Sequence, residues 1–70
     1  MTERTARQII DQTNILARRL YSLWGYTVPE GYRFDSATHP QEIAAWEAAC
    51  EAQIVLTDTD PMDAVNELDE

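Results

Sequence analysis

Cys50 and His39 are the side chains of this sequence that would pair in nucleophilic catalysis. A cysteine nucleophile needs a nearby base and surroundings that stabilise its thiolate. Both residues fall on one expected helix, where a rise of about 1.5 Å per residue separates them by about 16 Å. They therefore do not meet within one chain. We interpret Cys50 as a small buried apolar residue and His39 as a loop or helix-capping residue with its hydrogen bonds satisfied, with a pH-sensitive contact as the alternative for His39.

Carboxylates are the other groups with chemical potential. The acidic run at residues 58–63 resembles a calcium-binding loop, but Met62 and Asp63 occupy the fifth and sixth positions, where such a loop needs an oxygen ligand and a glycine. Glu47 and Glu51 share a helical ridge, yet nothing in the sequence indicates a cleft that would raise a carboxyl pKa. We therefore predict no catalytic residue, no metal ligand, no cofactor and no enzymatic activity.

Charge divides the chain into two unlike halves. The net charge is −8, all five basic residues lie at or before Arg33, and residues 36–70 carry nine acidic residues without a lysine or arginine. Such a surface repels phosphates and attracts a basic protein. We expect a protein partner with a basic surface and no direct nucleic-acid binding, with DNA binding by Arg4, Arg7 and Arg18 as a lesser alternative. The expected partner-binding residues are Glu47, Glu51, Asp58, Asp60 and Asp63.

The first element that positions these groups is an amphipathic helix at about residues 5–24. Thr5 and Gln8 have the spacing of a capping box, and Gly25 supplies a stop. Ile15 departs from the apolar pattern and is expected to contact something outside the monomer. The predicted buried face consists of residues at helical spacing, namely Ala6, Ile9, Thr13, Leu16, Leu20 and Trp24.

A loop follows at residues 25–38. Pro29 and Gly31 predict a β-turn over residues 28–31, flanked by residues 26–28 and 32–34. A miniature β-hairpin and an ordered loop folded across the helices are equally good interpretations, because two strands alone are marginal in water. The aromatic residues around the loop are expected to pack in the core, with a partner-facing patch as the alternative; they are Trp24, Tyr26, Tyr32, Phe34 and Trp46.

The second helix is predicted at about residues 39–56. Pro40 suits a first turn, and Thr38 with Gln41 suggests a capping box. Its predicted core stripe is Ile43, Trp46, Cys50 and Ile54. Alanines make this helix apolar nearly all round, which favours packing on a second copy of the chain. The residues expected to mediate self-association are Ala44, Ala45, Ala48, Ala52, Val55 and, from the first helix, Ile15.

Residues 57–70 are predicted to form an acidic tail or a short third helix, capped by Asp60 and started by Pro61, with Met62, Val65 and Leu68 on its apolar side. The predicted fold is thus a single all-α domain over residues 1–70. It is an antiparallel helical hairpin with an aromatic Pro-Gly loop, stabilised by self-association, because a single cysteine forms no internal disulfide. Without an apolar run of about 20 residues or a secretion signal, we expect a cytoplasmic protein that contacts no membrane.

The central segment carries a resemblance. GYTVPEGYRFD at residues 25–35, followed by THPQE at residues 38–42, resembles the small early-region accessory proteins of lambdoid temperate bacteriophages. The resemblance implies expression in the cytoplasm of a bacterial host and an effect on host or phage regulation through protein contacts. The predicted function is that of a non-enzymatic protein-binding accessory or regulatory protein. The alternative is a DNA-mimic inhibitor of a nucleic-acid-binding protein, in which carboxylates replace phosphates.

Overall fold

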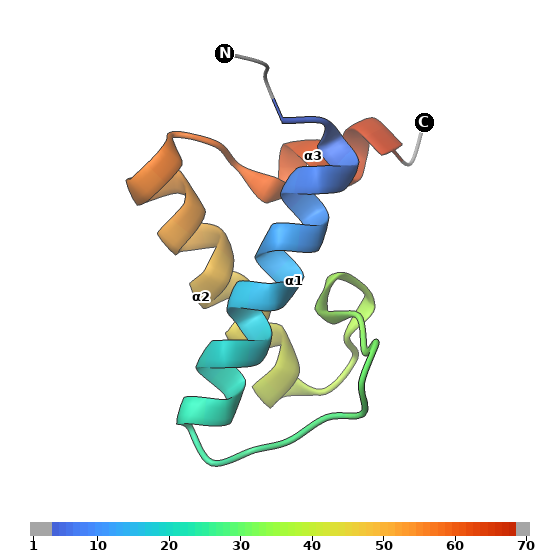
Figure 1. The fold of residues 1–70 in the computed structure, drawn as a ribbon, viewed down its shortest axis with the longest axis vertical. Helices are drawn as coiled ribbons and strands as arrows, with labels where there is room; N and C mark the ends of the chain where they lie inside the picture. The colour runs from blue at the N-terminus through green and yellow to red at the C-terminus, as the bar shows by residue number, and fades with distance from the viewer. Residues whose placement is uncertain (1–3, 69–70) are drawn as a thin grey trace.

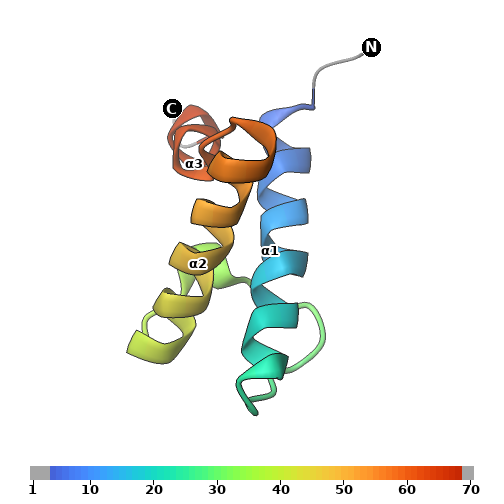
Figure 2. The same cartoon turned by 90° about the vertical axis from the view of Figure 1, so that its left-hand side faces the viewer.

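The computed structural model describes residues 4–68, which form three α-helices and one 3-10 turn. Helix α1 (Ala6–Leu23) leads into a long loop containing the 3-10 turn η1 (Phe34–Ser36), and α2 (Pro40–Thr57) and the short α3 (Pro61–Leu68) follow. Figures 1 and 2 show α1 and α2 side by side and running in opposite directions, with α3 near the start of α1. The described chain is therefore all-helical, as predicted. Among residues 4–68, no helix combines the length and apolar character needed to cross a membrane.

Local signals fix both ends of α1. Thr5 Oγ1 accepts a hydrogen bond from Gln8 N at 3.1 Å, and Gln8 Oε1 accepts one from Thr5 N at 2.9 Å. This is the predicted capping box. At the other end Gly25 adopts a φ of +94°, and Tyr26 N donates to Tyr21 O at 3.1 Å. Such a bond around a left-handed glycine is typical of a Schellman motif, so the predicted stop is confirmed.

The buried face of α1 is rotated from the predicted one. Only Thr13 of the predicted set is fully buried, whereas Trp24 is exposed. The loop explains the rotation, because Phe34 packs its ring edge on Tyr21 with ring centroids 5.5 Å apart. One side of α1 is therefore covered by α2 and another by the loop. The buried residues of α1 are Ile10, Thr13, Ala17 and Tyr21.

The loop takes the ordered form rather than the hairpin, and residues 25–39 contain no strand. Its turn lies one residue later than predicted, because Tyr32 N donates to Pro29 O at 3.1 Å. This register places Gly31 at the third turn position with a φ of +83°, which a type II turn requires. Glycine accepts this conformation at little cost, so the turn is centred where the chain tolerates it.

Asn14 holds the loop against α1. Its Oδ1 accepts a hydrogen bond from Phe34 N at 2.5 Å, and its Nδ2 donates to Asp35 Oδ1 at 2.8 Å. Arg33 adds contacts to Asp35 at 3.1 Å and to Asp11 at 3.2 Å. Burial by itself would raise the pKa of Asp35, but the hydrogen bonds from Asn14 and Arg33 outweigh it, so the pKa lies below its ordinary value.

Helix α2 begins at Pro40, but the predicted capping box between Thr38 and Gln41 is wrong. The residue before Pro40 is His39, whose side chain makes no capping bond. The third helical position is therefore Glu42 rather than Gln41. Tyr32 donates its hydroxyl to Glu42, and this hydrogen bond, with burial, raises the pKa of Tyr32 to about 12.

Alanines form the centre of the buried face of α2. Ala45 and Ala49 have no exposed surface, and side chains this small let α1 approach closely. Ala45 faces the inside of the chain, so its assignment to a self-association surface is wrong. Of the predicted core stripe, Trp46 and Cys50 are buried. Ile43 and Ile54 lie at the edge of the buried face, and each is 37% exposed.

Helix α3 docks on the other helices. Asp60 Oδ1 accepts a hydrogen bond from Met62 N at 3.0 Å, so Asp60 caps the helix as predicted. Pro61 and Ala64 are buried, while Met62 and Leu68 of the predicted apolar side are exposed and Val65 is half-buried. The last two residues of the predicted acidic tail, 69–70, lie outside the described residues.

Candidate functional site

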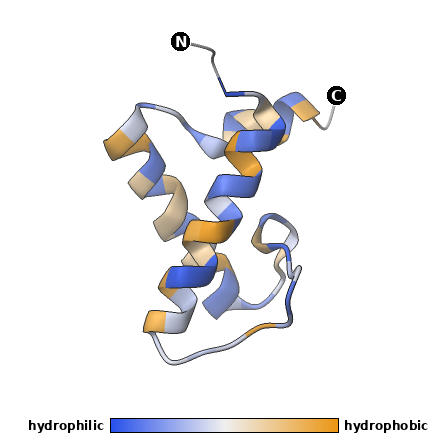
Figure 3. Ribbon diagram, viewed as in Figure 1, coloured by the Kyte–Doolittle hydropathy of each residue, from blue (hydrophilic) through white to orange (hydrophobic). Residues whose placement is uncertain are grey.

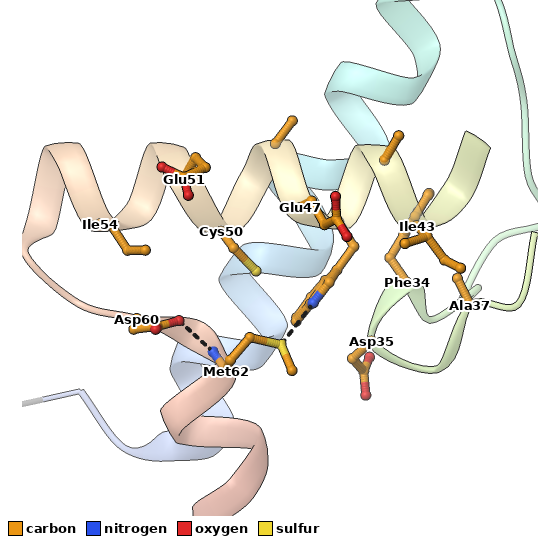
Figure 4. Close-up of a pocket in the computed structure, with 13 residues that line it drawn as sticks. Phe34, Asp35, Ala37, Ile43, Glu47, Cys50, Glu51, Ile54, Asp60 and Met62 are labelled. Atoms are coloured by element: carbon orange, nitrogen blue, oxygen red, sulfur yellow. Dashed lines mark hydrogen bonds between the residues drawn. The ribbon is translucent and has the colours of Figure 1, made fainter. Parts of the chain in front are cut away.

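An open groove of about 780 Å³ runs along the outer side of α2. We call it the acidic groove. Figure 4 shows Cys50 and Ile54 on α2 pointing toward the start of α3, with Asp60 lying across the groove from α2. Four carboxylates line it, and we call Glu47, Glu51 and Asp60 its rim carboxylates; the fourth is Asp35 of η1. We call its larger apolar lining residues from α2 and α3 the apolar floor; they are Ile43, Trp46, Cys50, Ile54 and Met62.

The structure brings together three of the five predicted partner-binding residues. Glu47 and Glu51 stand one turn apart on α2, and the connection between α2 and α3 places Asp60 opposite them. Asp58 does not line the groove, and its φ of +56° makes it the left-handed residue that ends α2. Asp63 lies in the first turn of α3 and does not line the groove either.

Contacts between α2 and α3 set the geometry of the groove. Trp46 Nε1 lies 3.3 Å from Met62 Sδ, so the indole N–H already has an acceptor. The cap that Asp60 provides holds Met62 at the start of α3. Met62 remains 44% exposed, and Ile43 and Ile54 also present apolar surface to the groove. These three side chains form an exposed apolar surface beside charged groups, which is typical of a binding site rather than of a core.

The three rim carboxylates, Glu47, Glu51 and Asp60, have no cationic partner within residues 4–68, whereas Asp35, which also lines the groove, pairs with Arg33 at 3.1 Å. The ion pairs there lie on α1 and the loop, where Arg7 and Arg33 take part, and none includes a rim carboxylate. Their negative charge reaches the groove floor. Burial, together with the nearby charges of Asp60, Glu47 and Glu51, raises the pKa of Cys50 to about 11.

The arrangement of Cys50 does not favour nucleophilic chemistry. A thiol with so high a pKa stays protonated near neutral pH, and His39 is not among the residues that line the groove. The run at residues 58–63 is used to end α2 and to cap α3. Within residues 4–68, no three side chains of His, Cys, Asp or Glu are grouped to hold a metal ion.

Comparisons of the chain with protein-family models, curated proteins and solved structures find no match.

The residues predicted for self-association divide between two places. Along α2, Ala44 and Val55 are exposed and Ala48 and Ala52 are half-buried. Ala44 and Ala48 also line the acidic groove, so a second copy of the chain bound there would compete with a partner in the groove. Figure 3 shows apolar colour at the carboxyl end of α2, where Val55 is 77% exposed. Ile15 is also exposed, but it lines a separate depression on α1 with Arg18, Tyr32 and other loop residues.

Sequence reasoning missed the apolar floor of the acidic groove. It assigned Ile43 and Ile54 to the core of α2 and Met62 to the buried side of α3. The spacing of Ile43 and Ile54, both near the edge of the apolar arc, was the available signal that they border solvent. Nothing in the spacing of Met62 indicated which helix it would face.

Proposed function

We propose that this chain is a non-enzymatic, protein-binding accessory or regulatory protein whose acidic groove receives a basic surface of another protein. The observation that supports this most directly is the partly exposed apolar floor beside three rim carboxylates, Glu47, Glu51 and Asp60, that lack a cationic partner within residues 4–68. Apolar contacts supply affinity at such a surface, while complementary charges steer the encounter and select the partner. Because residues 25–42 resemble accessory proteins of lambdoid phages, we propose that the partner is a host or phage protein in the bacterial cytoplasm.

The second candidate function is a DNA mimic that blocks a nucleic-acid-binding protein. The exposed carboxylates of Glu47, Glu51, Asp58 and Asp63 support it, since they could replace phosphates. The apolar floor favours the first candidate, because the phosphate backbone that a DNA mimic imitates has no such apolar surface. The two candidates differ in competition: duplex DNA displaces the partner of a mimic and leaves other partners bound.

We also propose that the chain self-associates through the exposed side of α2. Ala44, Ala48, Ala52 and Val55 support this, because small side chains allow two helices to approach closely. Light scattering over a concentration series should show a dimer that Val55→Arg weakens. A monomer at the highest concentration would contradict this part of the proposal.

Affinity capture from a bacterial lysate tests the main proposal. The groove variant Glu47→Lys/Glu51→Lys is compared with Glu30→Lys/Glu67→Lys, whose two glutamates are exposed and do not line the groove. Both double variants change the net charge equally. The proposal requires a captured protein that the groove variant loses and the control variant retains. Equal losses in both variants would contradict it, because net charge alone would then explain binding.

A further inference from the structure

We infer that the occupant of the acidic groove is an amphipathic helix of a partner protein, with an apolar stripe bordered on both sides by lysine or arginine. This inference rests on the proposed protein-binding function and specifies the form of the partner. Three observations support it: the length of the apolar floor, the helical secondary structure of the elements that line the groove, and the positions of the rim carboxylates.

The length of the floor fits a helix. Ile43 and Ile54 are eleven positions apart on α2, so they span about 16 Å, or three helical turns. A partner helix presents apolar residues at spacings of three and four, and about three turns of it would lie along this distance. Met62, which is flexible and polarizable, adapts to side chains of different shapes.

Other forms of peptide fit the walls poorly. An extended strand binds by adding to the free edge of a sheet, but the groove is built from α2, η1 and α3, and residues 4–68 contain no strand. Polyproline segments dock between exposed aromatic rings and commonly bond to an indole N–H. Here Trp46 is buried, and its N–H is directed at Met62 Sδ.

The carboxylates specify cations on both borders of the partner's stripe. Glu47 and Glu51 line the groove from α2, and Asp60 lines it from the opposite side. A neutral or acidic helix lying between them would displace water from these carboxylates without replacing their interactions, which is costly. A helix with lysine or arginine at both borders pairs with all three.

The first test uses a defined probe, a fluorescein-labelled peptide of about 18 leucine and lysine residues arranged as an amphipathic helix. Its controls are a scrambled peptide of the same composition and a peptide with glutamate in place of lysine. Fluorescence anisotropy at about 0.15 M NaCl should show binding of the first peptide at least about tenfold tighter than either control. Equal binding of the scrambled peptide would overturn the inference, because a helical stripe would not be recognised.

Matched variants then locate the contact. Ile54→Gln, in the groove, should weaken binding about tenfold, whereas Leu56→Gln, which is on the same helix, exposed and outside the groove, should change it less than about twofold. Glu47→Gln/Glu51→Gln should weaken binding similarly, and Glu30→Gln/Glu67→Gln should not. Far-UV circular dichroism confirms that each variant is folded. Equal effects of groove and control variants would overturn the inference.

A second copy of the chain is the competing occupant. If Ile54→Gln dissociated a dimer in sedimentation experiments and Val55→Gln did not, the groove would be a self-association site and the inference would be wrong. The outcome is separable from that of the proposed function. If lysate capture depended on Glu47 and Glu51 while the amphipathic peptide failed to bind, the function would stand and only the helical form of the partner would be rejected.

Discussion

Thr13 and Gln53 join α1 to α2 by a hydrogen bond inside the core. Both side chains are buried, and Gln53 Nε2 donates to Thr13 Oγ1 at 3.2 Å. Thr13 Oγ1 donates in turn to Ile9 O at 2.6 Å. Thr13→Val keeps the shape of the side chain and removes the acceptor. Gln53 Nε2 would then be buried without a partner, a situation that native structures rarely tolerate.

The structure predicts unequal costs for the two partners. Thr13→Val should lower the free energy of unfolding by about 1–3 kcal/mol, the cost of an unpaired buried amide donor. Gln53→Met should cost about 0.5–1.5 kcal/mol, because Thr13 Oγ1 keeps its bond to Ile9 O. In the double variant no donor is unpaired, so its cost should be close to that of Gln53→Met alone. These costs are large for a small chain, whose core rarely supplies more than about 3–5 kcal/mol.

Urea unfolding followed by far-UV circular dichroism measures these differences. Thr27→Val is the control, because it makes the same chemical change on an exposed side chain and should alter stability by less than about 0.5 kcal/mol. Additive costs in the double variant, to within about 0.5 kcal/mol, would refute the reasoning. So would a cost for Thr13→Val no greater than that of the control.

Three further predictions concern other parts of the molecule. Phe34 is 1% exposed, so Phe34→Ala should cost about 3–5 kcal/mol and abolish cooperative thermal unfolding, whereas a sharp melting transition would contradict its central role. At about pH 8 the Cys50 thiol, with a pKa of about 11, should react with a disulfide reagent about 100-fold more slowly in the folded chain than in urea; similar rates would contradict its burial. The pKa of Asp35 is lowered on folding, so its contribution to stability is present above the unfolded pKa of about 3.9 and is lost as pH falls through the folded value. Asn14→Ala should weaken this acid dependence in urea unfolding at several pH values, and an unchanged dependence would exclude Asn14 as its cause.

Local sequence signals determined where each helix begins and where α1 ends. The capping box of Thr5 and Gln8, the stop at Gly25, the start at Pro40 and the cap at Asp60 all match the structure. Each depends on atoms only a few residues apart, so neighbouring residue types are sufficient to specify it. The predicted capping box between Thr38 and Gln41 failed because α2 begins at Pro40 and its N-cap is His39, not Thr38. The third helical position is therefore Glu42 instead of Gln41.

The sequence also indicated part of the candidate site. The ridge of Glu47 and Glu51 follows from helical spacing, and the concentration of acid in the second half follows from composition. The tertiary structure decided the rest. Asp60 reaches the same groove because of the connection between α2 and α3, and Asp58 is left outside it as the end of α2.

Which face of each helix is buried was decided only by tertiary packing. Helix α2 is apolar around most of its circumference, so its period does not select a face; contact with α1 selects Ala45 and Ala49 and leaves Ile43 and Ile54 at the edge. Helix α1 turns toward the loop because Asn14 and Phe34 fix the loop there. The acidic groove combines both kinds of information: its charges are visible in the sequence, whereas its apolar floor exists because α3 docks beside α2 without covering it.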